Sequence, residues 1–466
     1  MPLISSISGI RGTIGSGDDN LNPQNFLNFC LSFGEFIKET KKNKKAKIVV
    51  GRDGRISGES FINLVINSLI FLGIDVVDIG LASTPTVEIA VVEEKADGGI
   101  IISASHNPKE WNALKLLNNK QEFMSKNSGE MVLKIAQEKN FSFVSIDNIG
   151  KIEKKYFYTD IHIKKILKLP LIKKGAIKKR NFKIVVDGIN SVGSLAIKRL
   201  LENLGIKDIV VINETINGKF NHNPEPIDKN LKQLFKAVKK NKADLGIAVD
   251  PDVDRLSFVD ERGVYFGEEN TLISVAKYVL ENYKLFKNKY KKVTVSNLSS
   301  SLGLRDVSEN FSGKCFFSPV GEVHVVAEMK KQKAVIGGEG NGGIIFPEFH
   351  YGRDALIGVA LFLSYLSSLK IKASELKDGL PKYFLIKHKI ELKKGLNIDI
   401  MFDKIEGKYK GLEISKSDGL KIVFSKEKSW VHLRKSNTEP IIRIYCEAPS
   451  KEKALNLLKE ISINLQ

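Results

Sequence analysis

The chain has few cysteines and no long apolar segment. Its three cysteines, Cys30, Cys315 and Cys446, lie far apart, so their number and spacing match neither a disulfide framework nor a zinc site. No apolar run reaches the roughly 18 residues that a membrane span requires. The N-terminal stretch MPLISSISGIRG also lacks the basic, apolar and small-residue order of a secretory signal. These absences predict a cytoplasmic protein without a membrane partner.

Arginine is scarce as well, since it supplies only 11 of the 73 basic residues of a chain whose net charge is +19. The lysines are scattered in pairs without interleaved aromatic residues, which predicts a solvated surface and no nucleic-acid partner. The net charge alone keeps a basic nucleic-acid-binding protein as an alternative. Most arginines lie in loops rich in Gly, Asp or Ser, where a guanidinium binds phosphate or carboxylate through two hydrogen bonds. They are Arg11, Arg52, Arg55, Arg255, Arg353, Arg434 and Arg443.

The sequence alternates short runs rich in Ile and Val with amphipathic stretches, which is typical of parallel α/β folds. This pattern begins near residue 46 and restarts near 181 and 292, and from about 375 short strands and a final helix indicate an antiparallel α+β domain. A chain of 466 residues is too long for one core. We therefore predict an α/β protein with three related mixed α/β domains and a smaller C-terminal α+β domain. The predicted boundaries are 1–155, 156–262, 263–374 and 375–466.

The segment VDPDVDR places Asp250, Asp252 and Asp254 at alternate positions, so their side chains share one face if the loop is extended. Three carboxylates this close repel one another without a cation, and such hard oxygens suit Mg²⁺. An EF-hand is excluded because Arg255 occupies the position of its required glycine and the flanking residues are typical of strands. The segment predicts a magnesium loop, with a solvated acidic turn as the alternative.

Two further loops carry polar side chains suited to sugars or phosphates. Gly338, Gly340 and Gly343 formally match a dinucleotide fingerprint, but the next residues, IIFP, do not open a helix, so the fingerprint fails. What remains there is either a tight turn or a loop that displays Glu339 and Asn341 to sugar hydroxyls. Near the C-terminus, HLRKSNTEPIIR lies between two predicted strands, and its guanidinium, hydroxyl and amide groups favour a phosphate nest over a self-capped turn.

The hexapeptide SASHNP places Ser105 just after the apolar run that ends at Ile102. There is no nucleophile elbow, and His106 is expected to point away from Ser105 on an extended chain, so serine-hydrolase chemistry fits poorly. A phosphate on Ser105 would carry a charge of about −1.5 to −2 and would need a cation and arginine donors. The Asp loop, Arg255 and Arg11 could supply both.

Taken together, these loops resemble the α-D-phosphohexomutase superfamily, which includes phosphoglucomutase, phosphomannomutase and phosphoglucosamine mutase. The resemblance rests on motifs that occur in the family's order over nearly the whole chain: SGIRG, GRDGRISG, STPT, SASHNP, HNPEP, DPDVDR, GGEGNGG and RKSNTEP. It implies a heart-shaped molecule with the site in a central cleft.

The resemblance also implies a role for each residue. Ser105 would be the phosphoserine, and its phosphate would bind Mg²⁺ together with Asp250, Asp252 and Asp254. Arg11 and Arg255 would steady that phosphate, Lys115 would act as acid or base, and His106 and Asn107 would brace the loop. The substrate-binding residues would be Glu339 and Asn341 for sugar hydroxyls, and Arg434, Ser436, Asn437, Thr438 and Arg443 for the phosphate that is not transferred.

The sequence departs from the family's pattern at three places. Many bacterial relatives have GEMSGH in the sugar loop, whereas here Asn341 replaces the serine and Gly343 the histidine. Glu322 stands where some members have a histidine, and the phosphate loop reads SNT instead of SGT. A histidine-based acid/base step is therefore not expected from these positions.

On this resemblance we predict a phosphoglucosamine mutase, an isomerase that interconverts hexosamine 6-phosphate and 1-phosphate. The reaction would use a phosphoserine, Mg²⁺ and a hexose 1,6-bisphosphate intermediate, in a monomer or homodimer. The main alternative is a phosphomannomutase/phosphoglucomutase. A more distant alternative is a magnesium-dependent phosphatase, which would release inorganic phosphate.

Overall fold

The computed structural model describes residues 3–6, 9–17, 19–42, 45–391, 398–435 and 441–463. The chain forms two compact units, Met1–Thr271 with Gly342–Lys377, and Leu272–Asn341 with Asp378–Gln466. The third domain predicted from the sequence, 263–374, contributes to both units. Among the described residues, no helix is long and apolar enough to cross a bilayer.

The first sheet of the N-terminal unit has seven strands in the order β1-β2-β6-β5-β3-β4-β7. Its central strands β3, β4 and β5 are parallel, β6 pairs antiparallel with β5, and β2 pairs antiparallel with β6. The strands span Ile4–Ser6 (β1), Gly9–Thr13 (β2), Lys47–Arg52 (β3), Asp75–Leu81 (β4), Gly98–Ile102 (β5), Trp111–Asn118 (β6) and Ile152–Lys154 (β7).

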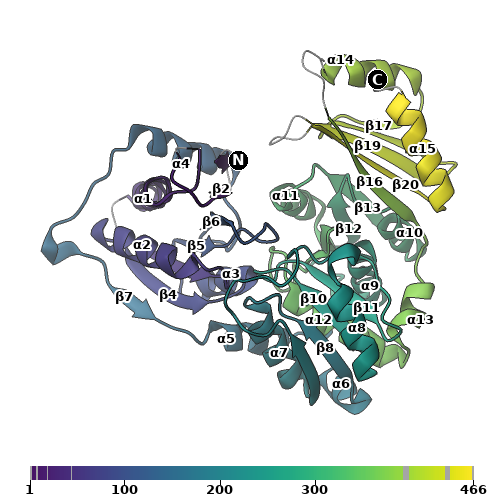
Figure 1. Cartoon of the computed structure of the whole chain (residues 1–466), viewed down its shortest axis with the longest axis horizontal. Helices are drawn as coiled ribbons and strands as arrows, with labels where there is room; N and C mark the ends of the chain where they lie inside the picture. The colour runs from purple at the N-terminus through teal and green to yellow at the C-terminus, as the bar shows by residue number, and fades with distance from the viewer. Residues whose placement is uncertain are drawn as a thin grey trace. The chain divides into compact units, whose positions relative to one another are not determined.

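Helices cover both faces of this sheet, so its central strands are apolar on both sides. Ile48 and Ile100 pack in the cluster that also contains residues of α1, α2 and α4, whereas their neighbours Val49 and Ile101 pack on the opposite face with α3. Figure 1 shows α1, α2 and α4 gathered along the sheet. The helices are Pro23–Thr40 (α1), Gly58–Phe71 (α2), Thr84–Glu93 (α3) and Lys126–Glu138 (α4).

The second sheet of this unit has the order β11-β10-β8-β9. Strands β9, β8 and β10 are parallel, and β11 pairs antiparallel with β10, so the residues between them form a hairpin loop. The strands are Lys183–Asp187 (β8), Asp208–Ile212 (β9), Leu245–Val249 (β10) and Leu256–Asp260 (β11). The helices are Tyr158–Ile166 (α5), Lys174–Arg180 (α6), Gly193–Leu204 (α7) and Lys232–Asn241 (α8). Single 3₁₀ turns occur at Ile146–Asn148, Asp228–Asn230 and Tyr283–Leu285.

The segment 342–377 completes the N-terminal unit with β15 (Gly343–Ile345), α12 (Ala355–Leu369) and α13 (Ala373–Asp378). Helix α12 is apolar almost all round, and every residue from Ala355 to Ser367 is buried. A helix of this kind belongs inside a core. The ring of Phe362 stacks on Phe258 of β11 with centroids 3.9 Å apart.

The C-terminal unit begins with the parallel strands β12 (Lys291–Asn297), β13 (Lys314–Ser318) and β14 (Ala334–Glu339). Helices α10 (Gly303–Asn310) and α11 (Glu322–Gln332) alternate with these strands, and α9 (Glu268–Glu281) precedes them. Strand β14 ends in a turn and no helix follows it, as the sequence context of the glycine-rich segment predicted.

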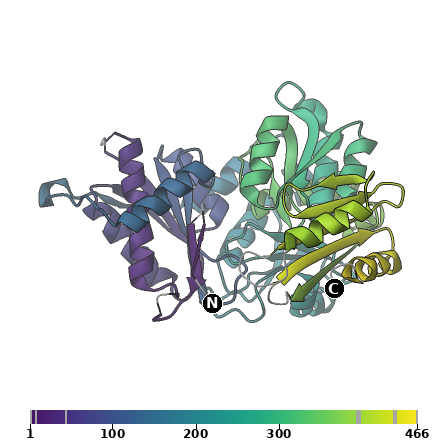
Figure 2. The same ribbon diagram turned by 90° about the horizontal axis from the view of Figure 1, so that it is seen from above.

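The last sheet is wholly antiparallel, with the order β16-β20-β19-β18-β17, as predicted for the C-terminal domain. Its strands are Phe384–Glu391 (β16), Glu413–Ser415 (β17), Leu420–Phe424 (β18), Ser429–Lys435 (β19) and Ile441–Ala448 (β20). Helices α14 (Ile398–Lys408) and α15 (Lys451–Ile463) pack on one face of the sheet (Figures 1 and 2). The fold class predicted from the sequence is confirmed.

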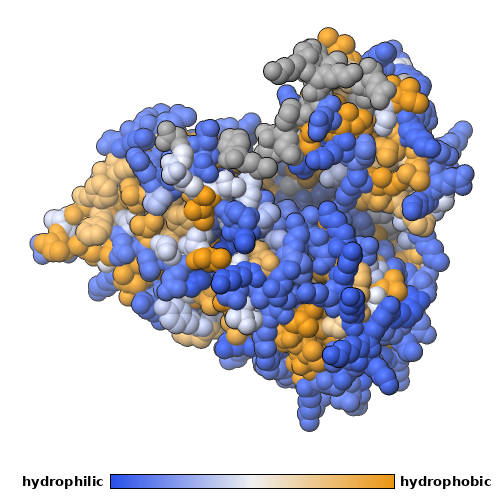
Figure 3. Space-filling view, in the orientation of Figure 1, coloured by the Kyte–Doolittle hydropathy of each residue, from blue (hydrophilic) through white to orange (hydrophobic). Residues whose placement is uncertain are grey.

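The surface is mainly hydrophilic on the face shown in Figure 3, and its hydrophobic residues form separate patches.

Candidate active site

The serine loop follows β5 directly and turns sharply at Ser105. Ser105 has a left-handed backbone, with φ of +49°, and its side chain is buried. The Ser105 Oγ donates to Asp250 Oδ2 at 2.5 Å, and the Ser105 amide donates to Ser103 Oγ at 2.9 Å. The sequence-based expectation that His106 points away was wrong, because His106 Nδ1 lies 3.3 Å from Ser105 Oγ. That expectation assumed an extended chain, and the left-handed residue reverses the direction of the next side chain.

Arg55 holds the serine loop in this conformation. Its two terminal nitrogens donate to four backbone carbonyls, and its Nε donates to the Asp53 carboxylate at 3.1 Å. All five N–H groups of the guanidinium are therefore used. The carbonyls belong to Ser105 (2.5 Å), Asn107 (2.6 Å), Pro108 (2.8 Å) and Trp111 (2.8 Å). The sequence indicated a phosphate or carboxylate partner for Arg55, and its bonds to carbonyls leave no signal in the sequence.

Asp53 binds Ser103 at the start of the serine loop and Arg55. Besides pairing with Arg55, its Oδ2 accepts from Ser103 Oγ at 2.7 Å. The next amide, that of Gly54, donates to Ser191 Oγ at 2.9 Å, and Ser191 Oγ donates to the Pro251 carbonyl at 2.6 Å. The serine loop and the loop that contains Pro251 are thus linked by buried hydrogen bonds.

Asp250, Asp252 and Asp254 lie on the loop between β10 and β11, and all three are fully buried. One carboxylate oxygen from each lies within 4.8 Å of the others. Within the described part of the chain, Asp252 Oδ1 and Asp254 Oδ1 have no hydrogen-bond partner. Burial and the two neighbouring aspartates raise the pKa of Asp250 well above its usual value. Buried partner-free oxygens of this type are what a Mg²⁺ ion requires, so these residues fit the metal.

The aspartate loop lies between the strands β10 and β11, whereas an EF-hand loop lies between two helices, so the loop is not an EF-hand.

Lys115 on β6 donates to Asp252 Oδ2 at 2.5 Å and lies 3.6 Å from Asp254 Oδ2. Burial favours a higher pKa for Asp252, but the charge and hydrogen bond of Lys115 hold that pKa below its usual value. Burial alone would lower the pKa of Lys115. The charges of Asp252 and Asp254 more than offset this effect, so the pKa of Lys115 is raised above its usual value.

Two more side chains hold the aspartates, and the sequence analysis gave neither of them this role. Thr84, the first residue of α3, donates its Oγ1 to Asp252 Oδ2 at 2.6 Å and its amide to the Asp252 carbonyl at 2.9 Å. Arg353 donates to Asp254 Oδ2 at 2.7 Å. The STPT motif and the position of Arg353 in a Gly/Asp loop were visible signals, but their partners lie 168 and 99 residues away.

Arg11 and Arg255 supply positive charge near the serine, and His106 lies beside them. Arg11 on β2 donates to Asn107 Oδ1 at 3.1 Å, which agrees with the predicted bracing role of Asn107. The Arg255 amide donates to Asp250 Oδ1 at 3.1 Å, and its buried Nε has no hydrogen-bond partner among the described residues. Burial and then the charge of Arg255 lower the pKa of Arg11. Burial and the nearby arginines also lower the pKa of His106, so an anion would be favoured here.

The sugar-binding candidates lie in the C-terminal unit. Glu339, the last residue of β14, is buried, and its Oε1 accepts from Asn297 Nδ2 at 2.9 Å and from the Gly321 amide at 3.2 Å. Asn341 lies in the turn that follows, and Glu322 begins α11. The Asn297 side chain and the Gly321 amide thus hold the Glu339 carboxylate at the end of β14, and its binding of sugar hydroxyls stays a prediction.

The described phosphate-binding candidates are two arginines that lie directly opposite one another on β19 and β20, Arg434 and Arg443. The register of β16 adds Lys389 beside Arg443, so three cations form a row across one face of the sheet. Like charges in such positions destabilise a sheet unless an anion lies between them. Asp418 Oδ2 lies 2.8 Å from Arg434 Nε and also accepts from the Val320 amide at 2.9 Å. The predicted residues Ser436, Asn437 and Thr438 lie outside the described residues.

Comparison with protein families matches almost the entire chain in four consecutive segments. Residues 4–142, 160–263 and 268–384 match phosphoglucomutase/phosphomannomutase alpha/beta/alpha domains I, II and III. Residues 386–463 match the C-terminal domain of the same enzymes.

Curated relatives and solved structures agree with this result. The chain is 35% identical to the phosphoglucomutase/phosphomannomutase of Thermococcus kodakarensis, covering 99% of this chain and 98% of the relative. It is 33% identical to the phosphoglucosamine/phosphogalactosamine mutase of Sulfurisphaera tokodaii, with the same coverage. The fold matches a phosphoglucomutase/phosphomannomutase family protein from Burkholderia thailandensis with a TM-score of 0.81 and 24% identity, over 100% of this chain and 98% of that one. Because all four domains and full-length relatives match, the chain belongs to the α-D-phosphohexomutase superfamily.

Proposed function

We propose that this phosphohexomutase is a phosphoglucosamine mutase that interconverts glucosamine 6-phosphate and glucosamine 1-phosphate through a phosphoserine at Ser105. The observation that carries the proposal is the contact of Ser105 Oγ with Asp250 at 2.5 Å, beside two buried carboxylate oxygens without a partner among the described residues. A hydroxyl that touches a metal loop is placed to carry a phosphate that shares the metal.

Asp250, Asp252 and Asp254 would hold Mg²⁺ together with the phosphate on Ser105. When bound, the cation would neutralise charge that develops on the transferring phosphoryl oxygens. Arg11 and Arg255 would hold the same phosphate from the protein side, which supplies a partner for the buried Arg255 Nε.

The transfer itself balances as an exchange of one phosphoryl group. The bond between phosphorus and Ser105 Oγ breaks while a new bond forms to the free sugar hydroxyl, which loses its proton. Ser105 gains a proton, and the sugar becomes the 1,6-bisphosphate. After the intermediate reverses its orientation, the other phosphate returns to Ser105 Oγ and the sugar oxygen is protonated. Lys115, in contact with the metal loop, is our candidate for carrying these protons.

Because the 1,6-bisphosphate binds in two opposite orientations, the enzyme needs a second site that binds the phosphate that is not being transferred. The row of Arg434, Arg443 and Lys389 suits this task, because Asp418 offsets one of its three positive charges and a phosphate would neutralise the other two. Glu339 and Asn341 are proposed to bind the sugar hydroxyls. The Glu339 carboxylate is already oriented by Asn297 and the Gly321 amide.

The choice of the amino sugar is supported by relatives whose names include phosphoglucosamine mutase, at 31–33% identity. The second candidate is a phosphomannomutase/phosphoglucomutase, which the name of the Thermococcus kodakarensis relative favours.

The deciding experiment measures kcat/KM for glucosamine 6-phosphate, mannose 6-phosphate and glucose 6-phosphate, with Mg²⁺ and a trace of hexose 1,6-bisphosphate. We expect the amino sugar to give the highest value. Equal rates, or a preference for mannose or glucose, would make the second candidate correct. Release of inorganic phosphate in place of the isomer would instead identify a phosphatase.

A further inference from the structure

A buried cluster of ionisable residues in the N-terminal unit has no part in the mechanism above. His350 precedes α12, and its ring lies between two carboxylates. Its Nδ1 is 3.1 Å from Glu88 Oε2 on α3, and its Nε2 is 3.1 Å from Asp354 Oδ2 at the start of α12. All three residues are at most 2% exposed. A pair of buried carboxylates needs a cation between them.

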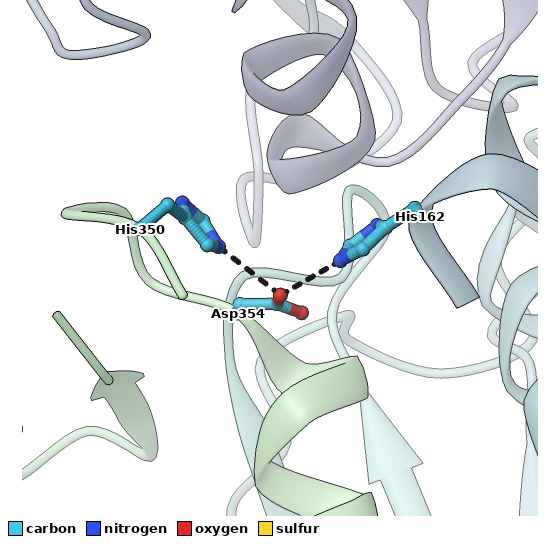
Figure 4. A group of neighbouring side chains, drawn as sticks. All are labelled: His162, His350 and Asp354. Carbon is cyan, nitrogen blue, oxygen red and sulfur yellow. Dashed lines mark hydrogen bonds and ion pairs between the residues drawn. The ribbon is translucent and has the colours of Figure 1, made fainter. Parts of the chain in front are cut away.

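A second histidine completes the cluster from α5. His162 Nε2 lies 2.9 Å from the same Asp354 Oδ2, and its Nδ1 lies 3.0 Å from Thr86 Oγ1. Figure 4 shows both rings directed at this one oxygen from opposite sides. The other oxygen of Asp354 caps α12 by accepting from the Leu356 and Ile357 amides at 2.8 and 3.3 Å. Every polar atom of both rings therefore has a partner.

Burial alone would lower the pKa of His350, but the hydrogen bonds and charges of Asp354 and Glu88 raise it to about 10. The Gly352 amide donates to His350 Nδ1 at 3.1 Å, so the ring's hydrogen bond to a carboxylate is the one between Nε2 and Asp354, and Nδ1 lies at ion-pair distance from Glu88. The space beside it is tightly filled, since a Cβ on Gly352 would lie 1.8 Å from Glu88 Oε2.

The two elements that His350 joins, α3 and the start of α12, both contact the metal loop. Helix α3, which carries Glu88, begins with Thr84, and Thr84 binds Asp252 through its side chain and its amide. Arg353, the neighbour of Asp354, donates to Asp254 at 2.7 Å. The amide of Ala355, the residue after Asp354, donates to the Val253 carbonyl at 3.2 Å. Three successive residues of the loop are thus held by elements that His350 joins.

We propose that His350 is a positioning residue for the metal loop. By bridging Glu88 and Asp354 it fixes the start of α3 relative to the start of α12, so that Thr84 and Arg353 hold Asp252 and Asp254 in place for the cation. The inference rests on the proposed role of the aspartates as magnesium ligands. Outer partners of this kind commonly change metal affinity by about 10- to 100-fold when they are replaced.

The same side chains, His162, His350 and Asp354, are of the types that bind zinc. We favour the ion-paired network because hydrogen bonds already use both nitrogens of each ring and both oxygens of Asp354. Tightly bound zinc is therefore an outcome that would overturn the proposal, and the metal content of the purified protein decides it.

The test compares wild type with His350→Gln, which removes the ring that lies 3.1 Å from both Glu88 and Asp354. Mg²⁺ affinity is measured by calorimetric titration and by the Mg²⁺ concentration that gives half-maximal mutase activity. We expect both constants to weaken by at least about tenfold, with the sugar KM at saturating Mg²⁺ changed by less than about twofold.

The matched control is Glu94→Gln at the other end of α3. Glu94, the C-cap residue of α3, pairs with Lys155 and Lys47, so its loss removes partly buried ion pairs at the end of the helix that is far from Thr84. The control should lower the melting temperature and leave Mg²⁺ affinity unchanged. If His350→Gln behaves like the control, His350 is only structural and the proposal is wrong.

Two further measurements keep the test decisive. Should His350→Gln fail to fold, Glu88→Gln removes the same bridge from the other side and is expected to weaken Mg²⁺ binding in the same way. Stoichiometric zinc that is present in wild type and lost in His350→Gln would overturn the proposal. Wild-type protein that neither binds Mg²⁺ nor needs it would instead refute the proposed function, a result distinct from a failure of the His350 proposal.

Discussion

Ser105 and the three aspartates show what single residues reveal in a sequence. The aspartate spacing and the position of Ser105 suggested a magnesium loop and a phosphate acceptor, the family resemblance joined them into one site, and the structure places Ser105 Oγ 2.5 Å from Asp250. The left-handed turn at Ser105 could not be predicted, since serine rarely adopts it. The roles of Arg55 and Arg353 were also hidden, because their partners are backbone carbonyls or a distant carboxylate.

Replacing Ser105 separates the chemistry of its hydroxyl from the strain of its backbone. Both Ser105→Ala and Ser105→Gly are expected to abolish mutase activity, since neither can carry a phosphate. Glycine adopts positive φ without a Cβ clash, so the Gly variant should be more stable than the Ala variant by roughly 0.5–1 kcal/mol in urea unfolding. Mutase activity of Ser105→Ala at the wild-type rate would refute the phosphoserine mechanism.

Arg55→Lys tests whether the serine loop must be held by a guanidinium. Lysine keeps the charge but cannot reach four carbonyls and Asp53 at once. A misplacement of the serine by about 1 Å is expected to lower kcat on the order of 100-fold. Arg52→Lys is the matched control, because Arg52 donates to the Asp53 carbonyl and lies 3.7 Å from Glu59, and neither of these contacts is with the serine loop. Similar losses in both variants would show that the loop does not depend on Arg55.

At the scale of elements, the sequence predicted the parallel and antiparallel sheets but not the register of their strands. The alternation of apolar residues identifies a strand and its buried face, whereas partner residues follow from the tertiary arrangement. Lys389 illustrates this limit. Nothing near it in the sequence suggests phosphate binding, and only the pairing of β16 with β20 places it beside Arg443.

Lys389→Met is expected to weaken binding of the phosphate that is not transferred. An exposed lysine contributes modestly, so we expect the KM for the sugar phosphate to rise roughly threefold, with kcat nearly unchanged. Lys387→Met on the same strand is the control, because Lys387 lies opposite Tyr445 and away from the two arginines. If both substitutions raise the KM for the sugar phosphate equally, Lys389 acts through general surface charge and does not bind the phosphate.

At the scale of the molecule, the four-part organisation was predictable, but the return of residues 342–377 to the N-terminal unit was not. The cause is α12, which is apolar almost all round and therefore has no polar face that would indicate its neighbours. Arg353 and Asp354, which directly precede α12, reach the metal loop and the His350 cluster because the helix is buried in that unit.

The His350 cluster predicts how the stability of the whole protein depends on pH. Glu88, Asp354 and His162 face the ring, and the two carboxylates raise the pKa of His350 from 6.5 to about 10. The folded protein therefore retains a proton that the unfolded chain releases near pH 6.5. The stabilisation is complete below pH 6.5 and is lost as pH rises toward 10.

Urea unfolding of wild type and His350→Gln between pH 6 and 10 measures this contribution, because all other titrating groups are common to both proteins. We expect wild type to be the more stable protein at pH 6, and the difference in free energy of unfolding to shrink steadily toward pH 10. A wild-type advantage over His350→Gln that stays constant across this range would mean that His350 is uncharged in the folded protein, and the two carboxylates would then need another cation.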